Sequence, residues 1–375
     1  MKFGLETLML TIVIFQLLFI SLFLVIAKKG NRTGNRLLAS VFVLFAISLS
    51  DIALFINLPI YDPLGFSLID DGFILLIGPL FYFYTITILH NKSKLSPRVL
   101  IHVLPYFIFT CGLISYYHFG NGQGLMDDIQ SFNIPPLAKL VIVLMQFHAF
   151  SYLIFSQRRL NEYRKMIKQR FSDIKDINLN WLSYTLKSFL ILLVLITIHN
   201  ILPLLQSSAY IEFTLILFLA FLFYFINKVI LSSLRQAPVP GGVWETAKEK
   251  YAGSNLTKAE LNRLKQILRS KMEEGKFYLN PDLNIEQLAD AINIHAKTLS
   301  QVINQGFDQN FFDFVNSYRL KEAKELLTNN AGDKMTILEI LYQCGFNSKS
   351  AFNAYFRRKE GISPTTFKKL NMSKN

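Results

Sequence analysis

The stretch from Ile337 to Phe367 holds the side chains whose types and spacing indicate the clearest chemistry in the sequence. Its pattern predicts a short apolar helix, a tight turn at Gly345, and a second helix with one apolar face and one polar, basic face. Amide, hydroxyl and cationic side chains on such a face can hydrogen-bond base edges and contact phosphates. A second stretch, Ile285 to Ile303, repeats the pattern. Two such units in tandem predict a bipartite nucleic-acid reader.

The sequence shows no motif for catalysis or metal binding beside these units. It contains no H-E-x-x-H, no G-x-x-x-x-G-K-[ST], no G-x-S-x-G and no kinase set of motifs. Cys111 falls in an apolar segment and Cys344 in the last domain, so they can form neither a disulfide with each other nor a Cys-based zinc site. We therefore expect no enzyme activity, no metal and no cofactor.

Helix starts in the last third of the chain are marked by capping side chains. Thr257, Asn284 and Thr336 each stand three residues before Glu or Gln, which is the capping-box pattern. Ser363 precedes a proline, which is favoured in the first turn of a helix. Apolar residues recur at helical spacing after these starts, and no segment has a convincing strand pattern.

The last third is therefore expected to be an all-helical domain. It covers residues 257–375, with helix-turn-helix units near 284–304 and 336–359. From Ser232 onward the chain carries 21 Lys and Arg against 15 Asp and Glu, a modest basic excess that suits a phosphate backbone.

The first 231 residues have a different character. The whole chain is 51% hydrophobic and only 17% charged, which is unusual for a soluble protein of 375 residues. Apolar runs of about 20 residues can cross the hydrocarbon core of a bilayer. Seven such runs are present, over residues 5–27, 37–57, 72–89, 99–119, 137–156, 182–202 and 209–231. The sequence thus predicts a seven-span transmembrane helical bundle over residues 1–231.

Charges between the runs predict the orientation. The first, third and fifth loops carry 14 Lys and Arg, whereas the second, fourth and sixth carry none. Because basic loops stay in the cytoplasm, the N-terminus is expected outside and the last third inside. The first run is too long, and its basic flank is on the wrong side, for a cleaved signal peptide. A Pro/Gly-rich stretch at 237–242 marks a linker over residues 232–256.

The segment from Asn284 to Lys369 closely resembles the DNA-binding domain of the AraC/XylS family of bacterial transcription regulators. The motifs that carry the resemblance are Leu288-Ala289, Leu299, Tyr318-Arg319-Leu320-x-x-Ala323, Ile340, Gly345-Phe346-x-Ser348, Phe352-x-x-x-Phe356-Arg357-Arg358, Gly361-x-Ser363-Pro364 and Phe367-Lys368. The apolar region ahead of it is similar, in topology alone, to membrane-embedded members of the family. One departure is His295, which stands where the family usually has a small capping residue such as Ser.

The resemblance implies that the second helix of each unit enters the major groove of double-stranded DNA. Aligned on Leu299 and Phe352, the residues that would read bases are Lys297, Ser300, Gln301, Lys349, Ser350, Asn353 and Ala354. The residues that would contact phosphates are Arg319, Arg357, Arg358 and Lys368.

Ionisable and amide groups within the apolar runs suggest a second site. Such groups are costly in a bilayer and often functional. By topology, five of them fall in the outer halves of their spans: Asp51, Lys139, His199, Asn200 and Glu212. One hypothesis is a pocket open to the outside that binds a small molecule or peptide. The alternative is that these groups form interhelical hydrogen bonds or reach to the membrane interface.

These expectations combine into a membrane-anchored, sequence-specific DNA-binding regulator in the bacterial inner membrane, which couples a signal to promoter binding. Its expected partners are double-stranded DNA, the lipid bilayer, an outside ligand, RNA polymerase and a second copy of the chain. Two alternatives stay open: a membrane transporter or enzyme with an autoregulatory DNA-binding tail, and a regulator released by proteolysis within the linker.

Overall fold

A computed structural model describes residues 4–27, 30–57, 67–91, 95–120, 135–204, 210–233, 256–328 and 335–372. Within these ranges the regular elements are helices, and one isolated antiparallel bridge pairs Phe171 with Asn284. The chain divides into two compact units. The N-terminal unit comprises residues 1–161 and 179–241, and the C-terminal unit comprises residues 162–178 and 242–375. The expected all-α class is confirmed.

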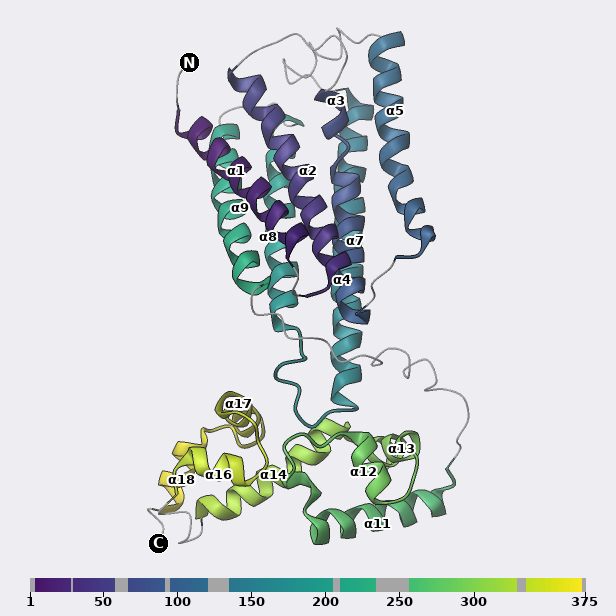
Figure 1. Ribbon diagram of the computed structural model, residues 1–375, viewed down its shortest axis with the longest axis vertical. Coiled ribbons are helices and arrows are strands. Elements are labelled where there is room, and N and C mark those ends of the chain that lie inside the picture. The colour runs from purple at the N-terminus through teal and green to yellow at the C-terminus, as the bar shows by residue number, and fades with distance from the viewer. Residues whose placement is uncertain are drawn as a thin grey trace. The chain divides into compact units, whose positions relative to one another are not determined.

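The N-terminal unit is a bundle of apolar helices (Figure 1). Its elements are α1 (Leu5–Ile26), α2 (Arg32–Asn57), α3 (Ser67–Asp70), α4 (Ile74–His90), η1 (Pro97–Val103), α5 (Leu104–Phe119), α7 (Pro136–Lys168), α8 (Asn180–Leu204) and α9 (Ile211–Ser233). The end of α7, from residue 162 onward, belongs to the C-terminal unit. Helix α1 packs against α2 and α9, α2 also contacts α4, and α8 packs against α9. In the interior, the ring of Phe81 on α4 stacks on that of Phe189 on α8, with 3.9 Å between centroids.

Among the described residues, six helices are long and apolar enough to cross a membrane: Leu5–Ile26, Arg32–Leu54, Pro97–Phe119, Pro136–Lys168, Asn180–Leu202 and Glu212–Val229. The expected third span, 72–89, corresponds to α4, an apolar helix of 17 residues. At 1.5 Å per residue this helix is about 25 Å long, a little less than the hydrocarbon thickness. Seven spans are therefore not confirmed, because the structure supports six by length.

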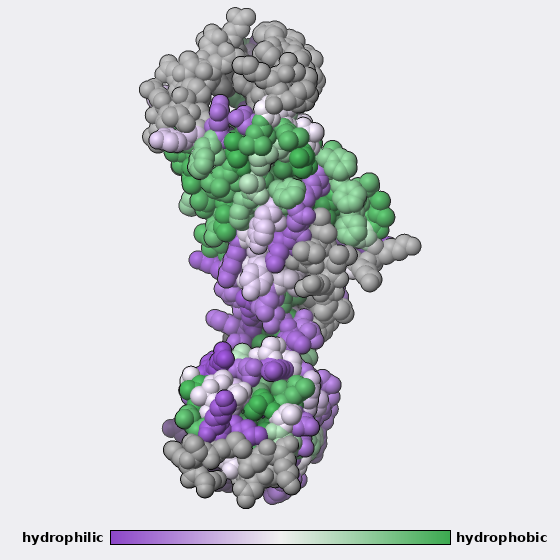
Figure 2. Space-filling view, turned by 90° about the vertical axis from the view of Figure 1, so that its left-hand side faces the viewer, coloured by the Kyte–Doolittle hydropathy of each residue, from purple (hydrophilic) through white to green (hydrophobic). Residues whose placement is uncertain are grey.

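The outer surface of the N-terminal unit is apolar. Phe15, Phe119 and Phe147 expose 72%, 91% and 71% of their surface. Figure 2 shows hydrophobic side chains spread over the visible face of this unit. Large exposed apolar areas are rare on soluble monomers, so this surface is compatible with a lipid environment.

The C-terminal unit is built from short helices. They are α11 (Lys258–Gly275), η3 (Phe277–Leu279), α12 (Ile285–Ala291), α13 (Ala296–Phe307), α14 (Phe311–Thr328), α16 (Ile337–Gln343), α17 (Lys349–Glu360) and α18 (Pro364–Met372). We call α12 with α13 the first helix pair, and α16 with α17 the second helix pair. Residues 234–255, most of the expected linker, lie outside the described residues.

Helix α14 belongs to two hydrophobic cores. Phe314 and Val315, in its first half, are buried with residues of α11 and the first helix pair. Leu320 and Ala323, in its second half, are buried with residues of the second helix pair. Because both pairs pack on this one helix, its position determines how the pairs are presented.

The local predictions for helix starts and turns are confirmed. Thr257, Asn284 and Thr336 each form a capping box with the Glu or Gln three residues later. Ser363 accepts a hydrogen bond from the backbone N–H of Thr366 at 3.1 Å, at the start of α18. Gly345 ends α16 with a φ of 82°, the left-handed conformation that glycine adopts most easily.

Candidate nucleic-acid interface

Helix α13 presents a polar face opposite a buried one. Leu299 is fully buried in the first core, as expected. Lys297 is exposed, and Ser300 and Gln301 are partly exposed. Gln301 donates to the side-chain oxygen of Gln305 at 3.3 Å, which aligns its amide along the helix. The three predicted base readers of this helix are therefore accessible side chains on one surface.

Helix α17 repeats this arrangement. Phe352 is fully buried in the second core. Lys349, Ser350 and Ala354 are exposed, and Asn353 is partly exposed. All four lie within the first two turns of the helix, where a helix that enters the major groove end-on presents its side chains to base edges.

The two helices begin differently. The side chain of Ser348 accepts a hydrogen bond from the backbone N–H of Ala351 at 3.2 Å and so caps α17. His295 precedes α13 and makes no side-chain capping bond. The departure noted at His295 thus leaves the start of α13 without the cap that α17 has.

Three of the four predicted phosphate contacts lie at the surface or near it. Arg357 is exposed. Arg358 is about half exposed and forms an ion pair with Asp313 of α14 at 2.6 Å. Lys368 is partly buried and donates from Nζ to the carbonyl oxygen of Met335 at 2.9 Å. Arg357 can approach a phosphate directly, whereas Arg358 and Lys368 also hold helices together.

The predicted phosphate contact of Arg319 is wrong. Only 1% of this residue is exposed. Its guanidinium donates to the carbonyl oxygens of Tyr278 and Asn280, both at 2.7 Å, and to the hydroxyl of Ser172 at 3.1 Å. Burial lowers the pKa of Arg319 to about 10. A side chain enclosed in this way cannot reach DNA, because its donors are engaged inside the protein.

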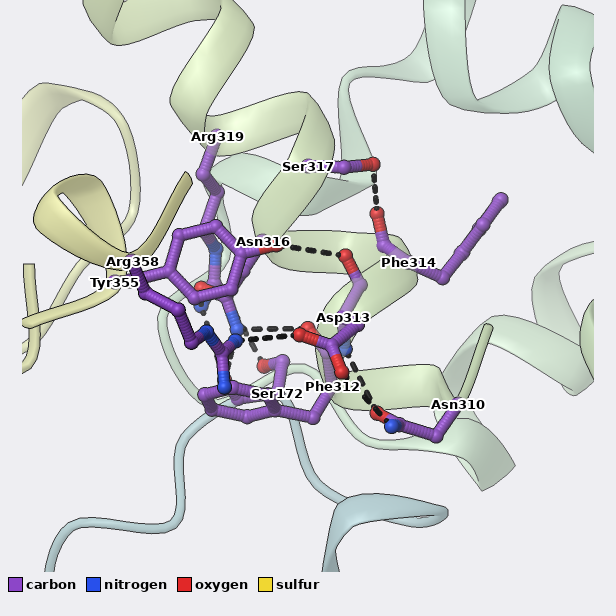
Figure 3. A network of polar contacts seen from close by, with 10 residues as sticks. All are labelled: Ser172, Asn310, Phe312, Asp313, Phe314, Asn316, Ser317, Arg319, Tyr355 and Arg358. Carbon is purple, nitrogen blue, oxygen red and sulfur yellow. Dashed lines mark hydrogen bonds and ion pairs between the residues drawn. The ribbon is translucent and has the colours of Figure 1, made fainter. Parts of the chain in front are cut away.

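Figure 3 shows the network around Arg319, which the sequence analysis missed. Asn316, one turn earlier on α14, donates to the carbonyl oxygen of Ser172 at 2.9 Å. Asn316 and Ser172 are both only 1% exposed. Ser172 lies in a basic loop whose charges indicated orientation only. Nothing in the sequence around Ser172 indicated a contact with α14.

The five polar residues predicted to line an outer pocket are spread over four helices. His199 on α8 lies 3.1 Å from the hydroxyl of Thr214 on α9, an interhelical hydrogen bond of the kind the alternative reading expected. Asp51 on α2 acts electrostatically on two carboxyls outside the candidate spans. Burial, reinforced by Asp51, raises the pKa of Asp70 to about 6. The charges of Asp70 and Asp51 also act on the neighbouring Asp71, which is exposed.

A groove of about 630 Å³ lies elsewhere in the N-terminal unit. Its walls come from α1, α2, α4 and the η1 region and include Ser21, Arg36, Leu76 and Val99. None of the five predicted residues lines it. An outer pocket formed by Asp51, Lys139, His199, Asn200 and Glu212 therefore stays a prediction.

Comparison with known proteins finds relatives of the C-terminal unit. Residues 288–370 match the family described as a helix-turn-helix domain. The Msm operon regulatory protein of Streptococcus mutans is 26% identical over 113 residues, which is 30% of this chain and 37% of that protein. The HTH-type transcriptional activator RhaS of Escherichia coli K12 is 28% identical over 83 residues, 22% of this chain and 29% of that protein. The chain thus spans well under half the length of these relatives. No solved structure matches it.

Proposed function

We propose that this chain, which carries a helix-turn-helix domain of the AraC/XylS type, is a sequence-specific DNA-binding transcription regulator anchored in the bacterial inner membrane. The N-terminal unit would lie in the bilayer with its N-terminus outside. The shorter apolar helix α4 would be the seventh crossing beside the six long helices, because only an odd number of crossings puts the two ends of the unit on opposite sides of the membrane. The C-terminal unit would lie in the cytoplasm and bind promoter DNA in response to a signal received by the membrane helices.

One observation carries the DNA-binding part of the proposal: both helix pairs bury one face of their second helix on cores that share α14 and leave a polar face accessible. Two helices fixed on one rigid helix can enter successive major grooves on one side of a duplex, where the grooves repeat about every 34 Å. The helix-turn-helix match covers α13, α14 and α17 completely.

The accessible side chains have the chemistry for reading bases. The amides of Gln301 and Asn353 can donate and accept at adenine, and the ammonium groups of Lys297 and Lys349 can donate to guanine. Each well-placed pair contributes roughly 1–3 kcal/mol of discrimination between bases. Ser300, Ser350 and Ala354 would complete the contact surface through hydroxyl and methyl contacts.

Phosphate contacts would position the domain on the duplex. Arg357 is the leading candidate because it is exposed. Arg358 and Lys368 would contribute while keeping their bonds to Asp313 and Met335. Phosphate contacts raise affinity for every sequence and make it dependent on salt.

Membrane anchoring is supported by six sufficiently long apolar helices among the described residues and by the outward-facing aromatic rings. It is also supported by 14 basic residues that lie, in the sequence, between alternate pairs of the apolar runs. The five polar residues of the outer helix halves would line the site for a small molecule or peptide. RNA polymerase and a second copy of the chain would be the protein partners, since two bipartite readers on paired DNA sites multiply affinity through effective concentration.

The test uses the full chain in detergent micelles. A preferred sequence is first selected from a random duplex library, and binding to this duplex and to an unrelated one is measured across a salt series. Asn353→Ala should change the preferred base at one position and leave the salt dependence as it was. Arg357→Ala should weaken binding to both duplexes equally and reduce the salt slope by about one.

Arg269→Ala provides the matched control, because Arg269 is an exposed arginine of α11 that faces its own helix neighbour Glu273 at 3.6 Å. It should behave like the wild type. Unchanged sequence preference in Asn353→Ala and Gln301→Ala would contradict the proposed reading surface.

A further inference from the structure

Residues 162–178 belong to the C-terminal unit, although they connect two helices of the N-terminal unit. Helix α7 ends at Lys168 and α8 begins at Asn180, so both ends of this segment continue directly into candidate membrane spans. The segment packs on residues more than 100 positions away in the chain. A loop that only closed a helical hairpin would need none of these distant contacts.

The backbone of the segment forms a miniature antiparallel ladder with the residues that start the first helix pair. The N–H of Ile285 donates to the carbonyl oxygen of Arg170 at 2.9 Å, and the N–H of Ser172 donates to that of Leu283 at 3.2 Å. The hydroxyl of Ser172 donates to the same Leu283 oxygen at 2.6 Å. The guanidinium of Arg170 forms an ion pair with Glu286 on α12 at 2.7 Å.

Side chains of α14 hold the segment from the other side. Asn316 and Arg319 both donate to the carbonyl oxygen of Ser172, at 2.9 and 3.4 Å, and Arg319 also reaches its hydroxyl at 3.1 Å (Figure 3). These two residues lie between Val315, which belongs to the first core, and Leu320, which belongs to the second. The segment is therefore held at the joint of α14 between the two cores.

The segment also satisfies a buried charge. Arg319 has lost its contact with water, so each hydrogen bond to its guanidinium offsets part of the cost of burial. Undocking the segment would take away two acceptors of Arg319, the carbonyl oxygen and the hydroxyl of Ser172, and would leave the burial of this charge less well compensated. The buried position of the Arg319 guanidinium would then be less favourable, and the two cores would be held less firmly relative to each other.

We propose that residues 170–172 are a docking segment that couples the membrane helices to the DNA-reading surface, with the docked state being the one that binds DNA. The proposal rests on the proposed function. A movement of α7 or α8 would decide whether residues 170–172 stay docked on α14. Undocking would change the packing of α14, and both helix pairs pack on that helix. Undocking would free the pairs from a fixed relative arrangement and lower the affinity for a bipartite site.

Docking can be measured separately from DNA binding. The hydrogen bonds of Ser172 and Ile285 flank the Phe171–Asn284 pair, which makes it a non-hydrogen-bonded pair of an antiparallel ladder, with a Cα separation typically about 4.5 Å. Cysteines at such a spacing can form a disulfide. Phe171→Cys with Asn284→Cys, in a Cys111→Ser background, should therefore crosslink in full-length protein in lipid nanodiscs, whereas either single substitution should not.

The coupling between docking and DNA binding is tested by reversing the charges of the ion pair between Arg170 and Glu286. Arg170→Glu places two carboxylates together and should lower both the crosslinking yield and the affinity for the selected duplex, the latter by about fivefold or more. Arg170→Glu with Glu286→Arg should restore both. Oxidised, crosslinked protein should bind DNA at least as well as the wild type and should do so even when Arg170→Glu is present.

Three outcomes would overturn the proposal. Absence of a crosslink would show that the segment is not docked. A lower crosslinking yield with unchanged DNA affinity would show that docking is not coupled to binding. Higher affinity on undocking would reverse the assigned state. A wild-type protein that binds no duplex would overturn the proposed function itself, and the crosslinking yield would still report on docking.

Discussion

The two helix pairs of the C-terminal unit make the same turn with different residues. The first turns at Asn293, with a φ of 57°, and the second at Gly345, with a φ of 82°. In each, the following residue donates its backbone N–H to the carbonyl oxygen five positions back, at 3.0 Å. Asparagine and glycine are the residues that best tolerate this left-handed conformation. One local geometry can thus be specified in two ways.

The neighbours of the two turns explain the difference. A Cβ atom on Gly345 would lie 2.6 Å from the carbonyl oxygen of Tyr278, so the second turn packs tightly against the η3 region. The first helix pair has no side-chain cap at His295 but receives the docking segment at Asn284 and Ile285. Both pairs therefore depend on contacts outside themselves. The second pair packs against the η3 region of the same unit, whereas the first pair contacts residues 170–172, which lie more than 100 positions away in the chain.

The largest effect is expected from Gly345→Ala. The substitution adds a left-handed strain of about 1–2 kcal/mol and a backbone clash, so the C-terminal unit should lose at least about 2 kcal/mol of stability. The measurement is the urea concentration at which a short protease pulse cleaves this unit in the full chain. Asn293→Ala is the matched control and should cost about 1 kcal/mol. Equal losses at the two positions would remove the contrast between the turns.

Ser348→Ala should have a smaller effect. It removes the hydroxyl that caps α17, and loss of such a cap costs about 1 kcal/mol. The same pulse-proteolysis assay measures it. Ser350→Ala, two residues later and exposed, should change stability by less than about 0.5 kcal/mol while still affecting DNA binding. If both variants are equally stable, the hydroxyl of Ser348 does not stabilise the helix start.

The smallest effect, of opposite sign, is expected from His295→Ser. A serine at this position can cap α13 as Ser348 caps α17, so stability should rise by up to about 1 kcal/mol. His295→Ala cannot provide the cap and should leave the urea midpoint close to that of the wild type. A loss of stability in the serine variant would mean that His295 contributes through contacts other than capping.

The features that the sequence predicted well are those decided within a few residues. The capping box at Thr336, the turn at Gly345 and the helical spacing around Phe352 depend on hydrogen bonds and steric limits of neighbouring residues. Apolar length likewise predicted most of the long helices, and the seventh span stays a prediction because α4 has only 17 residues. These properties can be read from the chain because their physical causes are local.

The properties that required the tertiary structure depend on which distant groups meet. The sequence could not distinguish Arg319, which is buried, from Arg357, which is exposed, because both are arginines in amphipathic helices. Nor could it assign residues 162–178 to the C-terminal unit, since the acceptors on Ser172 and the donors on α14 are separated by 144 and 147 positions. Local composition determines where helices form, whereas the burial of a charge and its partners is decided only when the chain has folded.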